Sequence, residues 1–101
     1  MEDVFKALGD VNRLRILGML AEDGETCVCV FTEQLGMGQS AVSHHLASLK
    51  RAGLVHSRRQ GQWIHYSLNV DAIKDGPLAF LKELVDSARQ PADKDAARKC
   101  C

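Results

Sequence analysis

The segment from Gln39 to Ala52 constrains the fold more than any other part of this chain. Its apolar residues Val42, Leu46 and Leu49 recur at the i, i+4, i+7 spacing of a single helical stripe. The opposite face carries small and hydrogen-bonding side chains, namely Ser40, Ser43, His44, Ala47 and Arg51. We therefore expect a helix that packs on a core along one side and can approach a second molecule closely along the other.

Helices are also predicted before this segment. Apolar residues repeat at helical spacing from Val4 to Val11 and from Asn12 to Glu22, and a short helix should run from about Cys29 to Leu35. Gly36 stands where a left-handed C-terminal cap is wanted, and Gly38 can serve as the N-cap of the next helix. A tight turn should thus join the third and fourth helices.

Two short strands are predicted after the fourth helix. Leu54 to Arg58 and Trp63 to Leu68 flank the turn Gln60-Gly61, a pattern typical of a hairpin. The side chains that crowd its tip are those of Arg58, Arg59 and Gln62. Two helices joined by a turn and followed by a basic hairpin predict a winged helix-turn-helix domain, mainly α with a small β-hairpin wing.

One more helix is expected near the C-terminus. Asp71 to Asp75 can form a single turn, and Pro77, a residue favoured at the first helical position, should open a helix that runs to about Gln90. Its apolar face, and that of the first helix, have little to cover them except a second copy of the chain. We expect a homodimer whose interface contains Val4, Phe5, Leu8, Leu78, Leu81, Leu84 and Val85. The domain then spans residues 1–90, and the polar segment 91–101 is predicted to be a flexible tail.

Charge is distributed unevenly along the chain, although the net charge is zero. No Asp or Glu lies between Gln34 and Val70, a stretch that contains Lys50, Arg51, Arg58, Arg59 and all four histidines. Such a basic surface suits a DNA backbone, and the candidate contacts are Gln39, Ser40, Ser43, His44, Arg51, Arg58, Arg59 and Gln62. His45 is expected at the edge of the core instead, and Trp63 is expected to pack rather than to stack on DNA.

Composition excludes several classes of protein. No apolar run approaches the roughly 18 residues that a membrane helix needs, and the first residues, Met1-Glu2-Asp3, lack the basic charge of a signal peptide. We expect a cytoplasmic protein, in which the four cysteines favour ion binding or redox sensing over disulfides. No catalytic carboxylate pair, phosphate loop or nucleophile arrangement is visible, so the sequence predicts no enzyme and no required cofactor.

The cysteine pair Cys27 and Cys29 lies just ahead of the helix-turn-helix pattern. Residues i and i+2 point in different directions in a regular helix or strand, so both sulfurs can clasp one ion only where the helix start is irregular. The helix N-terminus is also expected to lower the cysteine pKa and so prepare thiolates for a soft ion. Binding would pull on the third helix, which should pack against the fourth.

A resemblance to a known family rests on five segments. They are Leu8 to Leu17, Cys27 to Cys29, Gln39 to Leu46, Gly53 to Val55 and Arg59 to Leu68. In order and spacing they resemble the ArsR/SmtB family of metal-responsive winged-helix repressors, over about Val4 to Leu68. The resemblance implies a homodimer on double-stranded operator DNA, at an imperfect inverted repeat, that leaves the DNA when an inducer binds. The Cys27-Val28-Cys29 run is similar to the arsenite-sensing branch, whose inducers are trivalent arsenite and antimonite.

The chain departs from that family pattern in two places. Thr32 stands where the arsenite branch commonly has a third cysteine, and arsenite prefers three thiolates. Cys100 or Cys101 is the candidate for the missing ligand, because an extended chain from Pro91 to Cys100 spans up to roughly 30 Å; equally, the terminal pair is incidental. No histidine lies beyond His65, so the zinc-type site of the family's last helix is not expected.

Alternative interpretations stay open at this point. Cadmium, lead or zinc would use the same thiols, with zinc preferring four ligands, and a redox-sensing repressor would oxidise them to disulfides. A thiol oxidoreductase usually carries Cys-x-x-Cys in a βαβ setting, which is absent. A winged helix that contacts only proteins is disfavoured by the acid-free stretch. A repressor released by arsenite or antimonite is the favoured hypothesis.

Overall fold

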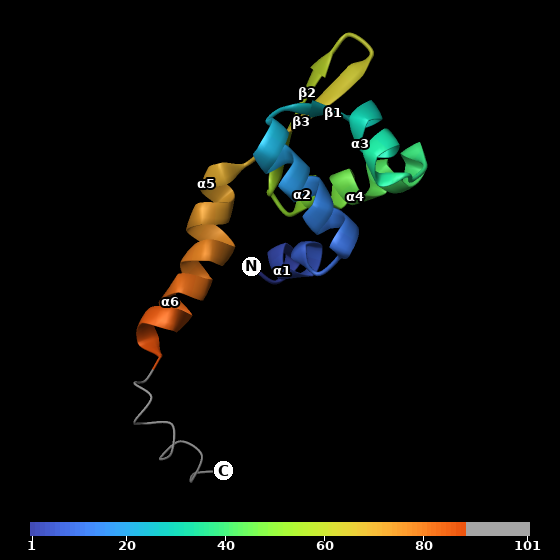
Figure 1. Ribbon diagram of the computed structural model, residues 1–101. Coiled ribbons are helices and arrows are strands. Elements are labelled where there is room, and N and C mark those ends of the chain that lie inside the picture. The colour runs from blue at the N-terminus through green and yellow to red at the C-terminus, as the bar shows by residue number, and fades with distance from the viewer. Residues whose placement is uncertain (89–101) are drawn as a thin grey trace.

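The computed structural model describes residues 1–88 and has the predicted winged helix-turn-helix architecture (Figure 1). Its helices are α1 (Glu2–Leu8), α2 (Val11–Asp23), α3 (Val28–Leu35), α4 (Gln39–Arg51), α5 (Val70–Ile73), a π-helical segment η1 (Lys74–Leu78) and α6 (Ala79–Ser87). Its strands are β1 (Thr26–Cys27), β2 (Val55–Gln60) and β3 (Trp63–Leu68). The predicted tail, with Cys100 and Cys101, lies outside the described residues.

The core lies between α2, α3, α4 and the start of the wing. Phe31 of α3 is fully buried at its centre, and the α4 stripe Val42, Leu46 and Leu49 is fully buried as predicted. The other buried apolar residues are Ala7, Ile16, Leu17, Leu20, Leu54 and Val55. Each large side chain buried in this way contributes about 1.5–3 kcal/mol to folding. The helical period of α4 therefore leaves its opposite face free for another molecule.

The start of α2 is fixed by a side-chain cap. The carboxylate of Asp10 accepts hydrogen bonds from the backbone N–H groups of Asn12 (2.8 Å) and Arg13 (3.2 Å). These bonds favour the ionised carboxyl, and the one from Arg13 is the main reason that the pKa of Asp10 lies below its usual value. The cap sets the first turn of α2, and with it the Arg13 side chain, beside α4.

The sheet contains one strand that the sequence analysis did not predict. β1 pairs with β3, which pairs with β2, so the order is β1-β3-β2 and both pairings are antiparallel. In this register Cys27 lies opposite His65, and His65 lies opposite Arg58. A two-residue strand leaves no periodic signal, and only its pairing with the distant β3 defines it. The sheet thereby joins the cysteine pair to the wing.

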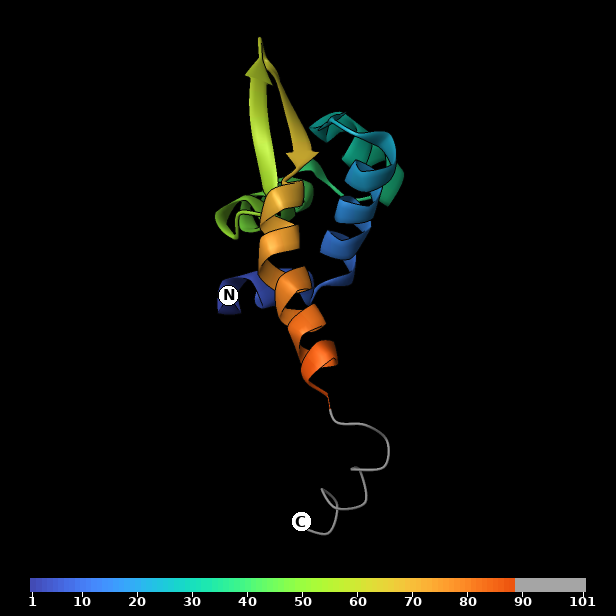
Figure 2. The ribbon, with the colours of Figure 1, turned by 90° about the vertical axis from the view of Figure 1, so that its left-hand side faces the viewer.

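The C-terminal helix corrects one prediction. Pro77 does not open a helix; it is buried inside a continuous helical rod from Val70 to Ser87 (Figure 2). Proline lacks an N–H and its ring clashes with the carbonyl four residues back, and the wider π-helical turn η1 accommodates both effects. The rod extends away from the body (Figure 1). Within residues 1–88, none of the helices has the length and hydropathy of a membrane span.

Candidate functional site

A hollow of about 250 Å³ lies where the cysteine pair, α4 and the wing meet. We call it the thiol hollow. Its lining residues are Cys27, Val28, Cys29, Thr32, Gln39, Ser43, Gln62, Trp63, Ile64 and Tyr66. Three of the predicted DNA contacts, Gln39, Ser43 and Gln62, thus share one hollow with both cysteines.

The two cysteines reach the same hollow because they lie on different kinds of backbone. Cys27 ends β1 in an extended conformation (φ −78°, ψ 148°) and is the N-cap residue of α3, whereas Cys29 lies in the first turn of that helix. This junction is the irregular helix start that the spacing of the pair requires. Neither thiol forms a disulfide within residues 1–88; Cys27 is half-buried and Cys29 is exposed.

The predicted lowering of the cysteine pKa is wrong for Cys29. A hydrogen bond with the Cys27 thiol, followed by partial burial, raises the pKa of Cys29 above its ordinary value, and the backbone N–H of Val30 offsets this only in part. In the described part of the chain, no Lys, Arg or His lines the thiol hollow, so none of these cations favours the thiolate there. Cys29 is therefore a neutral thiol near neutral pH.

Thr32 lies on the wall of the thiol hollow, one turn beyond Cys29. Its hydroxyl donates a 2.8 Å hydrogen bond to the carbonyl oxygen of Cys29. Within residues 1–88, no three His, Cys, Asp or Glu side chains are grouped so that they could hold a metal ion. Cys100 and Cys101, the predicted third ligands, lie outside the described residues.

The predicted DNA-contacting residues of α4 and the wing are exposed. They are Gln39, Ser40, Ser43, His44, Arg51, Arg58, Arg59 and Gln62. His45 is half-buried and accepts a 3.3 Å hydrogen bond at Nδ1 from Nε of Arg13, as expected for a residue at the edge of the core. Trp63 retains 51% of its surface exposed, so the prediction that it packs away is wrong in the single chain.

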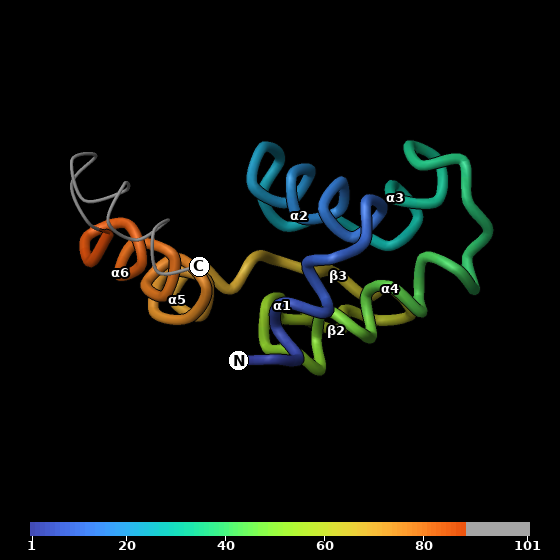
Figure 3. Tube along the Cα trace, turned by 90° about the horizontal axis from the view of Figure 1, so that it is seen from below, coloured from blue at the N-terminus to red at the C-terminus, as the bar shows by residue number. Residues whose placement is uncertain are grey.

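A second hollow, of about 570 Å³, lies on the other side of α4, where α1 packs beside it (Figure 3). We call it the basic hollow. Its lining residues are Asp3, Lys6, Ala7, Arg13, His44, Ser48, Arg51 and Ala52. The Arg51 guanidinium is oriented by a 3.2 Å hydrogen bond to the Ser48 hydroxyl. Lys6 and Arg13 were not predictable from the acid-free stretch, because both lie outside it and only the fold brings them to α4.

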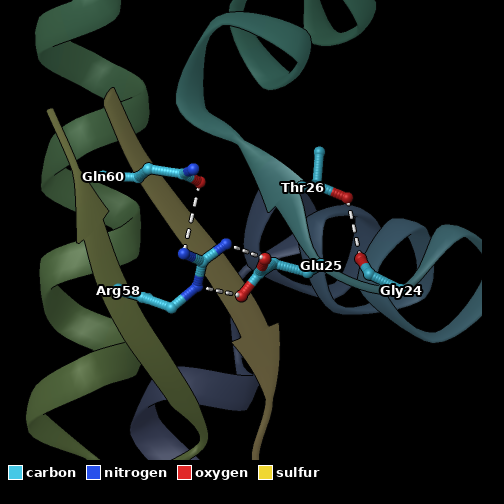
Figure 4. A network of polar contacts seen from close by, with 5 residues as sticks. All are labelled: Gly24, Glu25, Thr26, Arg58 and Gln60. Carbon is cyan, nitrogen blue, oxygen red and sulfur yellow. Dashed lines mark hydrogen bonds and ion pairs between the residues drawn. The ribbon is translucent and has the colours of Figure 1, made fainter. Parts of the chain in front are cut away.

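The wing residue Arg58 forms an ion pair with Glu25, which was not predicted from the sequence (Figure 4). Its Nη2 and Nε donate to the two carboxylate oxygens of Glu25 at 2.6 and 3.1 Å, and its Nη1 donates to Oε1 of Gln60 at 3.2 Å. The guanidinium beside Glu25 holds the pKa of that carboxyl below its usual value, and the pKa of Arg58 is raised in turn. Among residues 1–88, no acidic side chain forms an ion pair with Arg59; its Nε donates to the carbonyl of Gly61 at 3.2 Å.

The residues predicted for a dimer interface fall into two groups. Val4 and Leu8 of α1 are half-buried against the chain's own core, and the Phe5 ring packs edge-on against Phe80 with centroids 5.7 Å apart. On the helical rod, the four predicted interface residues have exposed side chains. They are Leu78 (54%), Leu81 (49%), Leu84 (54%) and Val85 (73%).

Comparison with known proteins identifies the family. Residues 10–57 match the family model of bacterial regulatory proteins of the arsR family. The chain is 40% identical over 95 residues to an arsenic resistance transcriptional regulator, ArsR1, of Pseudomonas putida, covering 94% of this chain and 73% of that protein. It is 38% identical over 71 residues to a CadC homolog, a cadmium resistance transcriptional regulatory protein of Staphylococcus aureus, covering 70% of this chain and 59% of that protein.

A solved structure agrees with this assignment. The homodimeric winged helix-turn-helix DNA-binding domain Mb0332 of Mycobacterium bovis superposes with a TM-score of 0.68 at 31% identity, covering 88% of this chain and 81% of that one. The fold, the family model and the relatives point to one class of protein. This chain belongs to the ArsR family of DNA-binding transcriptional regulators, which are not enzymes.

Proposed function

We propose that this chain is an operator-binding repressor that arsenite or antimonite releases from DNA by binding to Cys27 and Cys29. One observation carries the proposal: the thiol hollow is lined by both cysteines and also by Gln39, Ser43 and Gln62 from the DNA-reading elements. An ion held in that hollow lies beside the surface that reads DNA. Ion binding to the cysteines can then weaken DNA binding without a signal that crosses the whole domain.

The DNA surface combines α4 with the wing. Ser40, Ser43 and His44 are exposed in the first half of α4 and are proposed to meet base edges in the major groove of double-stranded DNA. Arg51, Arg58 and Arg59 are proposed to contact phosphates, with Gln39 and Gln62 between the two groups. The operator is expected to be an imperfect inverted repeat with half-sites about one helical turn apart, matching a two-fold symmetric dimer.

The chemistry of the thiols favours arsenite over cadmium. Arsenite in neutral water is the uncharged As(OH)₃, and each thiol that replaces a hydroxide releases one water, so no proton has to be lost to solvent. A divalent metal ion needs thiolates and displaces their protons. Because its neighbour Cys27 raises the pKa of Cys29, the protonated Cys29 thiol suits As(OH)₃ better than Cd²⁺.

Coupling to DNA is proposed to run through α3. An ion that draws Cys27 and Cys29 together alters the strand-to-helix junction where α3 begins, and α3 packs against α4 through the buried Phe31. A coupling free energy of about 1–3 kcal/mol per ligand is typical of such switches, which is about 5- to 150-fold in operator affinity. Two sites in a dimer would multiply these factors.

A homodimer is proposed because the exposed apolar side chains of the rod form a surface that a second copy would cover. Burying Leu81 against a partner contributes about 1.5–3 kcal/mol. We expect Leu81→Glu to give monomers in sedimentation velocity runs. Lys82→Glu, one residue along and exposed, is the matched control and should leave the dimer intact. An unchanged dimer in Leu81→Glu would remove this helix from the interface.

One titration tests the proposed inducer. An operator selected from a random duplex library is labelled, bound by the protein and titrated with arsenite, antimonite, cadmium, lead and zinc, with anisotropy as the readout. Arsenite and antimonite should release the DNA at the lowest concentrations. Release by cadmium or lead alone would show that the protein senses divalent metal ions, and release by diamide alone would show that it senses thiol oxidation.

The third thiolate is proposed to come from Cys100 or Cys101. X-ray absorption on the arsenite complex should then count three sulfurs around arsenic in the full chain and two in a chain ending at Arg98. The shortened chain should also need more arsenite for release. If it still shows three sulfurs and releases equally well, the tail does not supply a ligand.

A further inference from the structure

The carboxylate of Glu25 joins the cysteine-bearing strand to the wing. We propose that Glu25 competes with DNA phosphate for the wing arginine Arg58, and that this competition transmits inducer binding to the wing. The inference rests on the proposed function. It makes Glu25 a positioning residue, a role that DNA binding by itself does not require. Glu25 precedes Cys27 by only two residues, whereas Arg58 lies on the far strand of the sheet.

The geometry of the ion pair is that of a competitor for phosphate. Glu25 accepts two parallel hydrogen bonds, from Nη2 (2.6 Å) and Nε (3.1 Å) of Arg58. A phosphate binds arginine through the same two-pronged edge, so the guanidinium cannot present it to both anions at once. When DNA approaches, Arg58 must leave Glu25, or the carboxylate must stay beside a phosphate of like charge.

The pair is exposed enough to exchange. The side chains of Arg58 and Glu25 are 53% and 38% exposed, and an ion pair in that setting is screened by water and salt. Glu25 therefore weakens DNA binding without preventing it. Gln60, the third partner of the guanidinium, is uncharged and need not leave when a phosphate binds.

A short stretch of backbone connects the cysteines of the thiol hollow to the Glu25 carboxylate. The hydroxyl of the buried Thr26 donates a 2.8 Å hydrogen bond across Glu25 to the carbonyl of Gly24 (Figure 4). Thr26 begins β1, and β1 ends at Cys27, whose cross-strand row continues through His65 to Arg58. An ion that clasps Cys27 immobilises this short strand. Glu25 is then fixed against Arg58 and becomes harder for a phosphate to displace.

The first experiment needs no operator. Binding of Glu25→Gln to a random-sequence duplex is measured against salt concentration. We expect affinity to rise roughly two- to five-fold, the span of exposed ion pairs, and the salt dependence to steepen by about one phosphate contact, or about 0.9 in slope. Glu22→Gln removes the same charge three residues earlier, from an exposed side chain with no ion pair in the described part of the chain, and is the control.

The pairing itself is tested by a double-mutant cycle. In an Arg58→Gln background, Glu25→Gln should change neither the DNA affinity nor the salt slope, because the arginine that pairs with Glu25 has already been removed. Equal behaviour of Glu25→Gln and Glu22→Gln would overturn the proposal, since only net charge would then matter. Weaker DNA binding with a lower melting temperature in Glu25→Gln would also overturn it, because that is the result of a purely structural ion pair.

The second experiment adds arsenite to the operator complex. Glu25→Gln should bind arsenite like the wild type, as followed by the ultraviolet absorption of the arsenic–sulfur bonds, but its fold-release should be two- to five-fold smaller. Full wild-type release in this variant would overturn the regulatory part. A wild-type protein that does not bind DNA, or that arsenite does not release, instead contradicts the proposed function, so the two failures are distinguishable.

Discussion

The two hollows beside α4 differ in volume, in the charge of their side chains and in the presence of thiols. As lined by residues 1–88, the thiol hollow is smaller and contains two cysteines and no charged side chain, whereas the basic hollow contains Lys6, Arg13 and Arg51 and the carboxylate of Asp3. Ser43 and His44 are consecutive residues, yet they line different hollows, because successive side chains are about 100° apart on a helix. One helix therefore borders a hollow with two thiols on one side and a hollow rich in cationic side chains on the other.

Because of this difference, we expect that substitutions can separate inducer sensing from DNA binding. Substitution of Cys27, Cys29 or Thr32 in the thiol hollow should alter release and leave DNA affinity intact, whereas substitution of the cationic residues of the basic hollow should lower DNA affinity and leave release intact.

The largest effect is expected from the cysteines. Cys27→Ser and Cys29→Ser each remove one sulfur from the chelate, so arsenite should no longer release the operator, a loss of the full 5- to 150-fold response expected per ligand. Operator affinity without arsenite should equal that of the wild type. Anisotropy titrations measure both quantities, and a fall in operator affinity in either variant would show that the two functions overlap.

The next effect distinguishes ions by pH. The neighbouring Cys27 thiol raises the pKa of Cys29, so this thiol stays protonated from pH 6 to 8. Cadmium must displace that proton, and its potency should fall about tenfold for each unit that the pH is lowered. The potency of arsenite should be nearly independent of pH, because the thiol proton leaves with a hydroxide of As(OH)₃ as water. A steep pH dependence for arsenite would contradict the neutral-thiol interpretation.

A gain of function is expected at Thr32. Because Thr32 lies in the thiol hollow, Thr32→Cys places a third thiol beside the other two. Arsenite should then act at concentrations lower by roughly tenfold or more, since a ligand held in the same hollow has a high effective concentration. The same change in a chain ending at Arg98 should restore three sulfurs around arsenic. Ser43→Cys, on the α4 side of the hollow, shows whether any added thiol is sufficient.

The smallest effect is expected in the basic hollow. Arg13→Gln should weaken operator binding about threefold and lower the salt slope by about 0.9, the contribution of one phosphate contact. Arg15→Gln is the matched control, because Arg15 is an exposed arginine of the same helix that does not line the hollow. Arg13→Lys keeps the charge and should retain the slope. Identical slopes for Arg13→Gln and Arg15→Gln would remove this hollow from the DNA surface.

Much of the fold was predictable because the information is local. The stripe of Val42, Leu46 and Leu49 predicts both the α4 helix and its buried face, and the turn at Gly61 predicts the hairpin. The winged architecture follows from their order along the chain. Pro77 was misplaced because a proline rule describes isolated helix starts, whereas here a π-helical segment carries the helix through the proline.

The candidate sites divide along the same line. Sequence alone identified the cysteine pair, the exposed face of α4 and the basic wing, because neighbours in the chain or the helical period define each of them. Only the tertiary structure decided that β1 ties Cys27 to the wing, that Glu25 occupies Arg58 and that Lys6 and Arg13 stand beside α4. It also reversed the expected pKa shift of Cys29, because the nearby Cys27 thiol outweighs the end of a short helix. Charge and hydrogen bonding act through space, and the fold brings together residues that composition and periodicity keep apart.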